Sequence, residues 1–490
     1  MDAEKLTGRL QAILRDRRVR GGVGRAGESG GEPGAPGRPD PSGAPDPQDA
    51  VDVTVAGRAL RLERPPTPAE AFGAEERRGR AGRYLVVERS VDQGSWHGDR
   101  TAGEYETLLA RHTGALAVVA PDLARVAAGP PGSWLFFDLE TTGLSGGAGT
   151  CAFLVGCGWF DAGRFSTAQF FLDDYDQEEA ALTAVAELAR RFSAVVTYNG
   201  RAFDLPLIAT RYQLNRVESP FEGLPHLDTL HPARRLWRRV PRGEAVAEQR
   251  RFARGPGAWP GWQPEESSCS LTALEGRVLG AGRIGDVPGM EIPGRYFDYL
   301  RSRDATPLAA VVEHNRLDLL SLAALTSIVF ELADRGADAA RDAHECLALG
   351  RLYERAGDAG RADGCYRRAA GLEDAAAPAE GRRDQATRAE ALYRLAVRLR
   401  RRRQYAEAAD AWRRILDLDL APGTLLRDAS EALAIHHEHR ARDFEAALAF
   451  ARRALDAGPE DDRTARQALN HRLSRLERRL GASLAWEDER

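Results

Sequence analysis

The residues from Trp134 to Arg335 constrain the fold most, because strand-like and helix-like patterns alternate along them. Three apolar, β-branched or aromatic runs separated by Gly-rich turns, over residues 135–140, 151–160 and 164–172, predict a three-stranded meander. Further along, the periodicity predicts helices over 177–192, 205–213 and about 306–333, and strands over 194–198 and around 226–230. Antiparallel strands followed by a β-α-β unit and a closing helix predict an α/β fold, with a mixed sheet flanked by helices.

After Arg341 the strand patterns end and Ala-, Leu- and Arg-rich helical sequence continues nearly to the C-terminus. Small and large residues alternate there at the spacing of a helix-turn-helix repeat, at Gly350, Tyr353, Gly357, Ala362, Tyr366 and Ala369. The same frame fits residues 396–415 and, more loosely, 444–459. This pattern resembles the tetratricopeptide repeat, although its period is 46 and then 39 residues instead of about 34. We expect an all-α domain of such repeats over 341–480, and a generic Ala-rich helical bundle is the alternative.

The N-terminal 130 residues are predicted to differ in character from the α/β segment that follows. Residues 6–18 form an amphipathic pattern, and residues 21–49 are almost all Gly, Pro, Ala, Ser and charged residues. Such a segment buries too little apolar surface to fold, so residues 1–50 are predicted to be a short helix and a disordered linker. Short strand-like runs at 51–55 and 84–88 predict an accessory β-rich element over 51–130. A length of 490 residues fits about three domains.

Charge and cysteine content limit the class of protein. The formal net charge is −4, so a nucleic-acid partner would have to be met by local basic patches. Lys5 is the only lysine, so the many arginines reflect a compositional bias. The five cysteines form no C-x-x-C pair, which excludes a zinc-knuckle spacing, and their odd number fits a reduced, cytoplasmic compartment. No apolar run reaches membrane-spanning length, so we expect a soluble protein with no membrane partner.

Two carboxylates, Asp138 and Glu140, stand two positions apart in the apolar run 135–140. Side chains alternate between the two faces of a strand, so both carboxylates project from the same face. Burying unpaired carboxylates side by side is costly, and a hard divalent cation such as Mg²⁺ removes that cost. The pair therefore indicates a metal site, and the alternative is strand-end charges that face water.

Two further acids follow at positions that could complete such a site. Asp204 starts a predicted helix, where it either caps the helix N-terminus or points toward the first pair, with Phe203 as its core anchor. His314 and Asp318 lie four residues apart in the last helix of the α/β segment and so share a face. Asp318 is a candidate ligand and His314 a candidate base beside it. The alternative is a solvent-exposed His–Asp pair.

The order of these acids, strand, helix start and late helix, resembles the DEDD-type exonucleases of the ribonuclease H-like superfamily. The matching motifs are D-x-E at Asp138 and Glu140, N-x-x-x-F-D ending at Asp204, and the closing pair His314 and Asp318. Within that superfamily, the stretches 139–147, 269–271 and 287–289 with His314-Asn315 resemble the bacterial YprB-type group. The resemblance covers about residues 134–333, within an expected domain of 131–335. One departure is that His314 occupies the spacing, four before the last Asp, at which these families usually carry Tyr.

The resemblance implies hydrolysis of phosphodiester bonds with two divalent ions, Mg²⁺ or Mn²⁺, held by Asp138, Glu140, Asp204 and Asp318. His314, with a reference pKa of about 6.5, would take the proton of the attacking water, and its neighbour Asn315 is expected to be structural. The residues expected to bind the terminal nucleotide are Thr141, Thr142, Gly143, Leu144 and Asn199.

Two other features concern the substrate. Asp228 follows the second motif, as a similar acid does in several exonucleases of this class, and is expected either to support the site or to be a strand-end residue bonded to Thr229. The stretch 231–262 carries eight arginines, Arg238 and Arg239 among them, interleaved with three tryptophans. Arginine on phosphates with aromatic stacking on bases is typical of single-strand binding. A solvated loop enriched by compositional bias is the alternative.

We therefore expect a metal-dependent 3′→5′ exonuclease acting on single-stranded ends of DNA or RNA, with the helical repeats binding a protein partner. One alternative is a non-catalytic nucleic-acid-binding scaffold that recruits partners through its repeats, and the presence of all four acids favours the enzyme over it. Another is a structure-specific endonuclease or ribonuclease H-like enzyme that uses the same metals. The motifs do not separate this last activity from an exonuclease.

Overall fold

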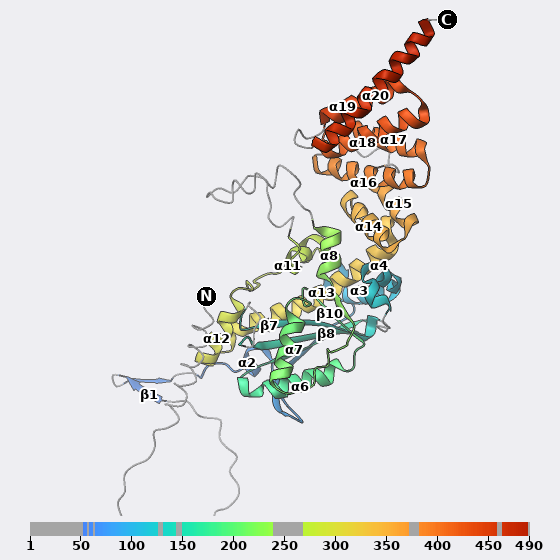
Figure 1. Ribbon diagram of the computed structural model, residues 1–490. Coiled ribbons are helices and arrows are strands. Elements are labelled where there is room, and N and C mark those ends of the chain that lie inside the picture. The colour runs from blue at the N-terminus through green and yellow to red at the C-terminus, as the bar shows by residue number, and fades with distance from the viewer. Residues whose placement is uncertain are drawn as a thin grey trace, which may run out of the picture.

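The computed structural model describes residues 52–55, 58–61, 64–125, 131–143, 149–238, 268–371, 382–457 and 463–488. The predicted helix over 6–18 and the predicted linker over 21–49 lie outside these residues, as do Leu144 and Arg239. Within the described residues, an α/β part is followed by a helical part that extends toward the C-terminus (Figure 1).

A seven-stranded mixed sheet in the order β11-β10-β7-β8-β9-β4-β3 forms the centre of the α/β part. Its strands are β3 (Glu75–Gly79), β4 (Gly82–Val91), β7 (Trp134–Thr141), β8 (Ala152–Asp161), β9 (Arg164–Phe171), β10 (Ala194–Thr197) and β11 (His226–Asp228). β7, β10 and β11 are parallel, and the other neighbours are antiparallel. The predicted meander of β7, β8 and β9 and the predicted α/β class are confirmed.

The sheet extends beyond the meander through strands that precede it in the chain. β4 pairs antiparallel with β9, and β3 pairs with β4. These two strands fall in the expected accessory element over 51–130, but they continue the main sheet instead of forming a separate one. Two small strand pairs lie outside it, β1 (Asp52–Val55) with β2 (Arg58–Arg61) and β5 (Trp96–His97) with β6 (Arg100–Thr101).

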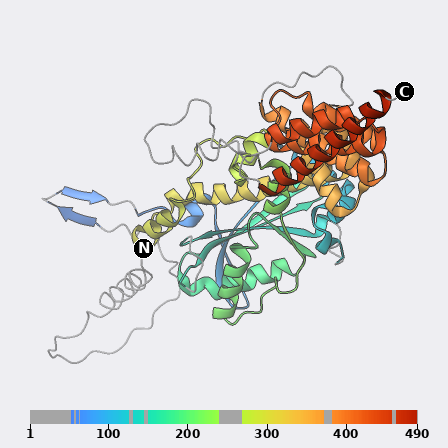
Figure 2. The ribbon, with the colours of Figure 1, turned by 45° about the horizontal axis from the view of Figure 1, so that its top comes forward.

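Helices cover both faces of the sheet (Figures 1 and 2). α6 (Glu178–Ala189) and α7 (Asp204–Leu214) lie on one face, and the long helix α13 (Ala309–Arg335) crosses the other. The remaining helices of this part are α2 (Pro68–Phe72), α3 (Ala102–Arg111), α4 (Leu116–Val119), α5 (Pro121–Arg125), α8 (Leu230–Trp237), α11 (Leu271–Leu274) and α12 (Ile292–Ser302). The predicted strand and helix ends differ from the observed ones by at most three residues.

The side chains of β7 alternate between two hydrophobic clusters. Phe136 lies in the cluster that contains α13, whereas Phe137 lies in the cluster that contains α6 and α7. Because alternate residues of a strand project from one face, Asp138 and Glu140 share the face of Phe136 and point toward α13. The carboxylate pair is therefore directed at the helix that carries the last predicted acid.

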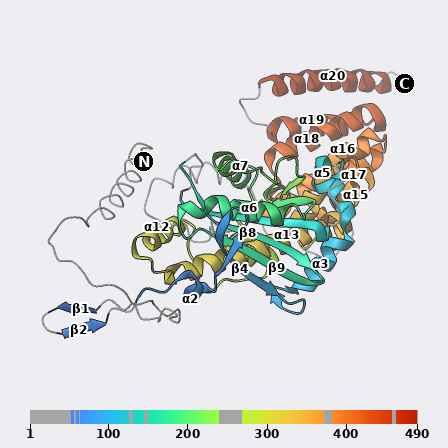
Figure 3. The same cartoon turned by 90° about the horizontal axis from the view of Figure 1, so that it is seen from below.

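The helical part consists of consecutive helices packed in pairs. These are α14 (Ala343–Ala356) with α15 (Ala359–Ala369), α16 (Arg382–Arg401) with α17 (Tyr405–Leu416), and α18 (Gly423–His436) with α19 (Phe444–Ala457), followed by α20 (Arg463–Asp488). A Cβ atom added at Gly350 of α14 would lie 2.4 Å from the ring of Tyr366 in α15, so glycine permits the close approach of this pair. Seen from below, α20 lies along the outer edge beside α19 (Figure 3). The predicted all-α region is confirmed.

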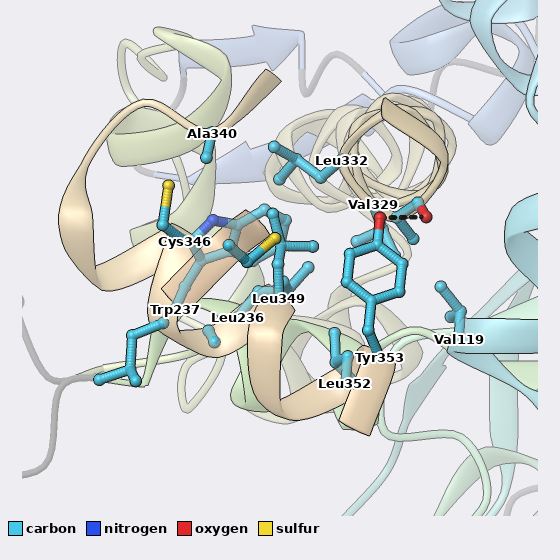
Figure 4. Packing of buried hydrophobic residues seen from close by; sticks show 14 of the residues in the cluster. Val119, Leu236, Trp237, Val329, Leu332, Ala340, Cys346, Leu349, Leu352 and Tyr353 are labelled. Carbon is cyan, nitrogen blue, oxygen red and sulfur yellow. Dashed lines mark hydrogen bonds between the residues drawn. The ribbon is translucent and has the colours of Figure 1, made fainter. Parts of the chain in front are cut away.

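The α/β part and the helical part share one hydrophobic core (Figure 4). Trp237 of α8 and Val329 of α13 belong to the same cluster as the first residues of α14. The indole Nε1 of Trp237 donates to the buried carboxylate of Glu345, with 2.8 Å between nitrogen and oxygen. The hydroxyl of Tyr353 donates to the carbonyl of Ala333 at 2.8 Å. The first contact fixes α8 against α14 at the junction, and the second fixes α13 against α14.

Among the described residues, no helix combines the length and apolar character needed to cross a bilayer. All five cysteines are free thiols, and four of them are buried.

Candidate active site

Asp138 and Glu140 of β7 face α13, the helix that carries Asp318, and Asn315 of that helix bonds Asp138 directly. Burial raises the pKa of Asp138 well above its usual range, and the negative charges of Asp318, Glu140 and Asp204 raise it further. The pKa of Glu140 is likewise raised by burial first, and then by Asp318 and Asp204. The charges of these acids affect the pKa of both Asp138 and Glu140, so the acids form one electrostatically coupled group. The structure thus brings together acids that are separated by up to 180 residues in the chain.

Asp204 is delivered to this site by the turn between β10 and α7. Asn199 adopts a positive φ of 67°, which lets the chain reverse direction after β10. Burial raises the pKa of Asp204 to about 7, although the backbone N–H groups of Asp204 and Leu139 hydrogen-bond its carboxylate. Since Leu139 stands between the two acids of β7, Asp204 lies beside them. Asp204 is the first residue of α7, whose N-cap is Phe203 with no side-chain cap hydrogen bond, so the capping interpretation is not supported.

Asp228 holds that turn in place. Its carboxylate accepts hydrogen bonds from the backbone N–H groups of Asn199 at 2.9 Å, Arg201 at 3.1 Å and Leu230 at 3.1 Å. The side chain is buried and its oxygen atoms are engaged by the backbone, not by Thr229 as the sequence alternative supposed. Asp228 therefore supports the site by shaping the loop that precedes Asp204.

Asp318 differs from the other three acids because a buried guanidinium is bound to it. Arg283 donates to both Asp318 and Glu275, and its Nη1 atom lies 3.2 Å from Asp286 Oδ2. The side chain of Arg283 is 6% exposed and that of Glu275 is 2% exposed. Burial raises the pKa of Asp318, while the positive charge of Arg283 opposes that rise. Arg283 thus balances part of the negative charge of the site.

His314 lies between two carboxylates. Its Nδ1 atom is 2.6 Å from Asp286 Oδ1, and its Nε2 atom is 3.6 Å from Asp318 Oδ2. The predicted sharing of one helix face by His314 and Asp318 agrees with this geometry. A carboxylate on one ring nitrogen orients the imidazole and leaves the other nitrogen to face the site. Asp286 therefore has the geometry of a carboxylate that orients a base.

The chemistry of the acids fits divalent cations. Asp138, Glu140 and Asp204 form no ion pair with an arginine or histidine in the described ranges, and burying three such carboxylates without a cation is costly. Oxygen donors of this kind suit Mg²⁺ and Mn²⁺. Across residues 64–125, 131–143, 149–238 and 268–371, however, no three His, Cys, Asp or Glu side chains are grouped closely enough to hold one ion. The carboxylate oxygens that could bind a cation are therefore present, and one of these carboxylates, Asp318, is hydrogen-bonded by Arg283.

The predicted substrate-binding residues differ in their surroundings, since some are hydrogen-bonded within a turn and others are exposed. The hydroxyl of Thr141 donates to the carbonyl of Gly143 at 2.9 Å, and that of Thr142 accepts from the N–H of Cys151 at 2.9 Å. Both threonines therefore shape the turn after β7. The side chain of Asn199 is exposed at the end of β10, and Arg238 is exposed at the end of α8. Leu144 and Arg239 lie outside the described residues.

Three residues of the site were not predicted, Arg283, Asp286 and Glu275. All three come from residues 268–302, a segment that has no regular sheet element and packs beside α13. Asp286 directly precedes the stretch 287–289, which carried part of the family resemblance. No spacing rule links these residues to the four acids, so a single sequence gave no signal for them.

Comparison with known proteins agrees with this architecture. A family model described as the RNase H superfamily matches residues 135–329. The uncharacterized protein YprB of Bacillus subtilis (strain 168) is 34% identical over 191 residues, which cover 39% of this chain and 40% of that protein. The chain therefore aligns with less than half the length of this curated relative. The matched segment runs from β7 through most of α13, so the α/β part contains an RNase H-like domain.

Proposed function

We propose that this chain is a divalent-metal-dependent nuclease, a 3′→5′ exonuclease of the DEDD type that acts on single-stranded ends. The observation that carries the proposal is the gathering of Asp138, Glu140, Asp204 and Asp318 at one interface, three of them without a basic partner in the described ranges. A site with this excess of buried negative charge is suited to bind cations. The RNase H superfamily match over residues 135–329 supports phosphodiester hydrolysis as the chemistry.

In the proposed mechanism, Asp138, Glu140, Asp204 and Asp318 would hold one or two Mg²⁺ or Mn²⁺ ions. Bound ions would supply positive charge for the developing phosphorane and lower the pKa of the attacking water. His314 would take the proton of that water at Nε2, while Asp286 holds the ring through Nδ1. Asn199 and the turn that contains Thr141, Thr142 and Gly143 would seat the terminal nucleotide, together with Leu144 of the sequence.

The exposed face of α8 supports a nucleic-acid substrate. His231, Arg234, Arg235 and Arg238 are exposed at helical spacing, and the three arginines have no acidic partner among the described residues. Burial lowers the pKa of Arg235, and the like charge of Arg355 lowers it further. Unpaired cations that repel one another favour a polyanion. Arg238, and Arg239 beyond it, would contact the phosphate backbone.

This face lies beside the candidate site. Burial raises the pKa of Tyr198, which follows β10, and the positive charge of Arg234 opposes that rise. Tyr198 precedes Asn199 and the turn that leads to Asp204. A strand held on α8 would therefore reach the acids along the end of β10.

The helical part would bind a protein partner through repeats of the tetratricopeptide type. The close approach at Gly350 and the pairing of α14 with α15, α16 with α17 and α18 with α19 support this role. A groove over α14, α16 and α18, in which Glu354 and Arg394 form an ion pair beside Tyr393, would be the place of contact with the partner.

The proposed activity is tested with end-labelled single- and double-stranded DNA and RNA, each incubated with Mg²⁺, with Mn²⁺ or with a chelator. A ladder that shortens from the 3′ end, present with metal and absent in the folded Asp138→Asn variant, is expected. Internal cuts would identify an endonuclease instead. Binding without cleavage by the parent protein in every metal would support the non-catalytic scaffold and reject the nuclease.

A further inference from the structure

Asp138, Gly156 and Gln169 form one row across three neighbouring strands. In the sheet register Asp138 of β7 pairs with Gly156 of β8, and Gly156 pairs with Gln169 of β9. Side chains at directly paired positions project from the same face of a sheet, which here is the face covered by α13. Asn315 of α13 lies over this row with no exposed surface.

Asn315 joins the two ends of the row by hydrogen bonds. Its Nδ2 atom donates to Asp138 Oδ2 at 2.8 Å, and its Oδ1 atom accepts from Gln169 Nε2 at 2.9 Å. Gln169 Nε2 also donates to the carbonyl of Val312 at 2.7 Å. A carbonyl can only accept, so Val312 fixes which end of the Gln169 amide faces α13. Gln169 in turn fixes the amide of Asn315, with its nitrogen toward Asp138.

Gly156 provides the space for this arrangement. A Cβ atom at position 156 would lie 2.3 Å from Asn315 Oδ1, far inside van der Waals contact. The φ angle of Gly156 is not positive, so the glycine is required by the close approach of the Asn315 side chain and not by its backbone conformation. Any larger residue at this position would displace the amide from the row.

We propose that Gln169 and Asn315 are positioning residues that orient the carboxylate of Asp138 for catalysis. The inference rests on the proposed nuclease function. An N–H donor favours the charged form of a buried carboxylate and fixes its rotation about the Cβ–Cγ bond. Asn315 donates a hydrogen bond to Asp138 Oδ2. Asp138 Oδ1 has no hydrogen-bond partner within the described part of the chain, so this oxygen remains available for a ligand.

Two variants disturb Asn315 by independent routes. Asn315→Ala removes the donor, and Gly156→Ala keeps every hydrogen-bonding group but pushes the amide aside. Thr326→Val is the matched control, since Thr326 is a buried polar residue of the same helix that bonds Thr229 Oγ1 at 3.0 Å, away from the acids. If Asn315→Ala fails to fold, Gln169→Met replaces it in the test. That variant retains Asn315 but removes the Gln169 amide that donates to Asn315 Oδ1.

Four quantities are measured for each folded variant: kcat and KM on single-stranded DNA, Mn²⁺ affinity by calorimetry without nucleic acid, and thermal stability. In Asn315→Ala and Gly156→Ala we expect kcat and Mn²⁺ affinity to fall roughly 10- to 100-fold with little change in KM, the usual effect of losing a group that orients a metal ligand. Thr326→Val should lose stability but keep kcat. A folded Asn315→Ala protein with parental kcat and Mn²⁺ affinity overturns the inference.

Asp138→Asn, measured in parallel, separates the two proposals. If Asp138→Asn retains full turnover, the proposed function fails and the inference fails with it. If Asp138→Asn is inactive while the Asn315 and Gly156 variants behave like Thr326→Val, the inference alone fails. If the parent protein cleaves no substrate, the proposed function is rejected, and unchanged Mn²⁺ affinity in Asn315→Ala then rejects the inference as well.

Discussion

Arg283 donates a hydrogen bond to the carboxylate of Asp318, a residue 35 positions further along the chain. This contact connects the segment 268–302 to α13 and places a positive charge among the carboxylates of the candidate site. The same guanidinium holds Glu275, which is almost fully buried. The electrostatic balance of the site therefore depends on a residue outside the four acids.

Replacing Arg283 should destabilise the protein strongly. In Arg283→Gln the carboxylates of Glu275 and Asp318 lose a buried cation, which for buried ion pairs costs about 3–5 kcal/mol. Arg303→Gln is the control, because that side chain is 41% exposed in its pairing with Asp173 and Asp174 and should contribute about 1 kcal/mol or less. Urea denaturation measures both. Equal losses would show that Arg283 does not act as a buried counter-charge.

The stability of the metal-free protein should depend on pH through Asp204. Its pKa is raised from 3.8 to about 7, so the folded state binds this proton more tightly than the unfolded state. The contribution of such a group to the free energy of unfolding is complete below its unfolded pKa and is lost as the pH rises through its folded pKa.

We therefore expect the parent protein in chelator to lose stability relative to Asp204→Asn between about pH 4 and pH 7. The loss should approach roughly 1.4 kcal/mol for each unit of difference between the folded and unfolded pKa. Added Mg²⁺ should reduce it, since bound cations favour the charged form. Urea denaturation across this range measures the difference, and parallel pH curves for the two proteins would contradict the expectation.

Loosening the turn before α7 should impair the site without touching an acid of the proposed metal set. Asp228→Asn replaces one acceptor oxygen by an N–H₂ group, which then opposes a backbone N–H of Asn199 or Arg201. An unsatisfied buried group costs about 1–3 kcal/mol. We expect that loss of stability, together with a fall in kcat, because Asp204 is delivered by this turn. Normal kcat in a destabilised protein would limit Asp228 to a structural role.

The arginines of α8 should govern the salt dependence of nucleic-acid binding. For single strands, each phosphate contact contributes about −0.7 to the slope of log K against log salt. Replacing Arg234, Arg235 and Arg238 together by Gln should therefore reduce the slope by up to about 2. The matched control replaces three ion-paired surface arginines, Arg64, Arg77 and Arg83. If both triple variants show the parental slope, the α8 face does not contact the phosphate backbone of the nucleic acid.

Two glycines of the first helix pair should respond oppositely to the same substitution. At Gly350 the added methyl group would meet the Tyr366 ring at 2.4 Å, whereas at Gly364 of α15 no atom lies within 4 Å. Gly350→Ala should lower the free energy of unfolding by about 1–3 kcal/mol through overpacking, which thermal denaturation detects. Gly364→Ala should be stabilising by up to about 1 kcal/mol, since alanine favours a helix. Equal effects would rule out close packing of α14 and α15 at this position.

Much of the fold could be predicted because its signals are local. Continuous apolar, β-branched or aromatic runs between Gly-rich turns identified β7, β8 and β9, and the helical pattern identified α13 within three residues at each end. The periodicity of strands and helices predicted that Asp138 and Glu140 share a face and that His314 and Asp318 do so. Period two in a strand and 3.6 in a helix are properties of the backbone, so neighbouring residues suffice to reveal them.

Other parts of the site depended on how distant segments meet. Asn315 was expected to be a structural residue, because nothing near it in the sequence indicates that the row formed by Asp138, Gly156 and Gln169 lies beneath it. Strand register and the placement of a helix over a sheet are set by packing over the whole domain. The strands β3 and β4 joined the main sheet for the same reason, since sheet partners are chosen by tertiary packing.

The sequence by itself determined which elements form and which face of each carries its acids, because these follow from backbone periodicity along a few residues. Tertiary structure alone decided that Arg283 neutralises Asp318, that Asp286 holds His314 and that Asn315 binds Asp138. Each of these contacts joins residues at least 28 positions apart. Their formation depends on desolvation and geometry that exist only once the sheet, α13 and the segment 268–302 have packed together.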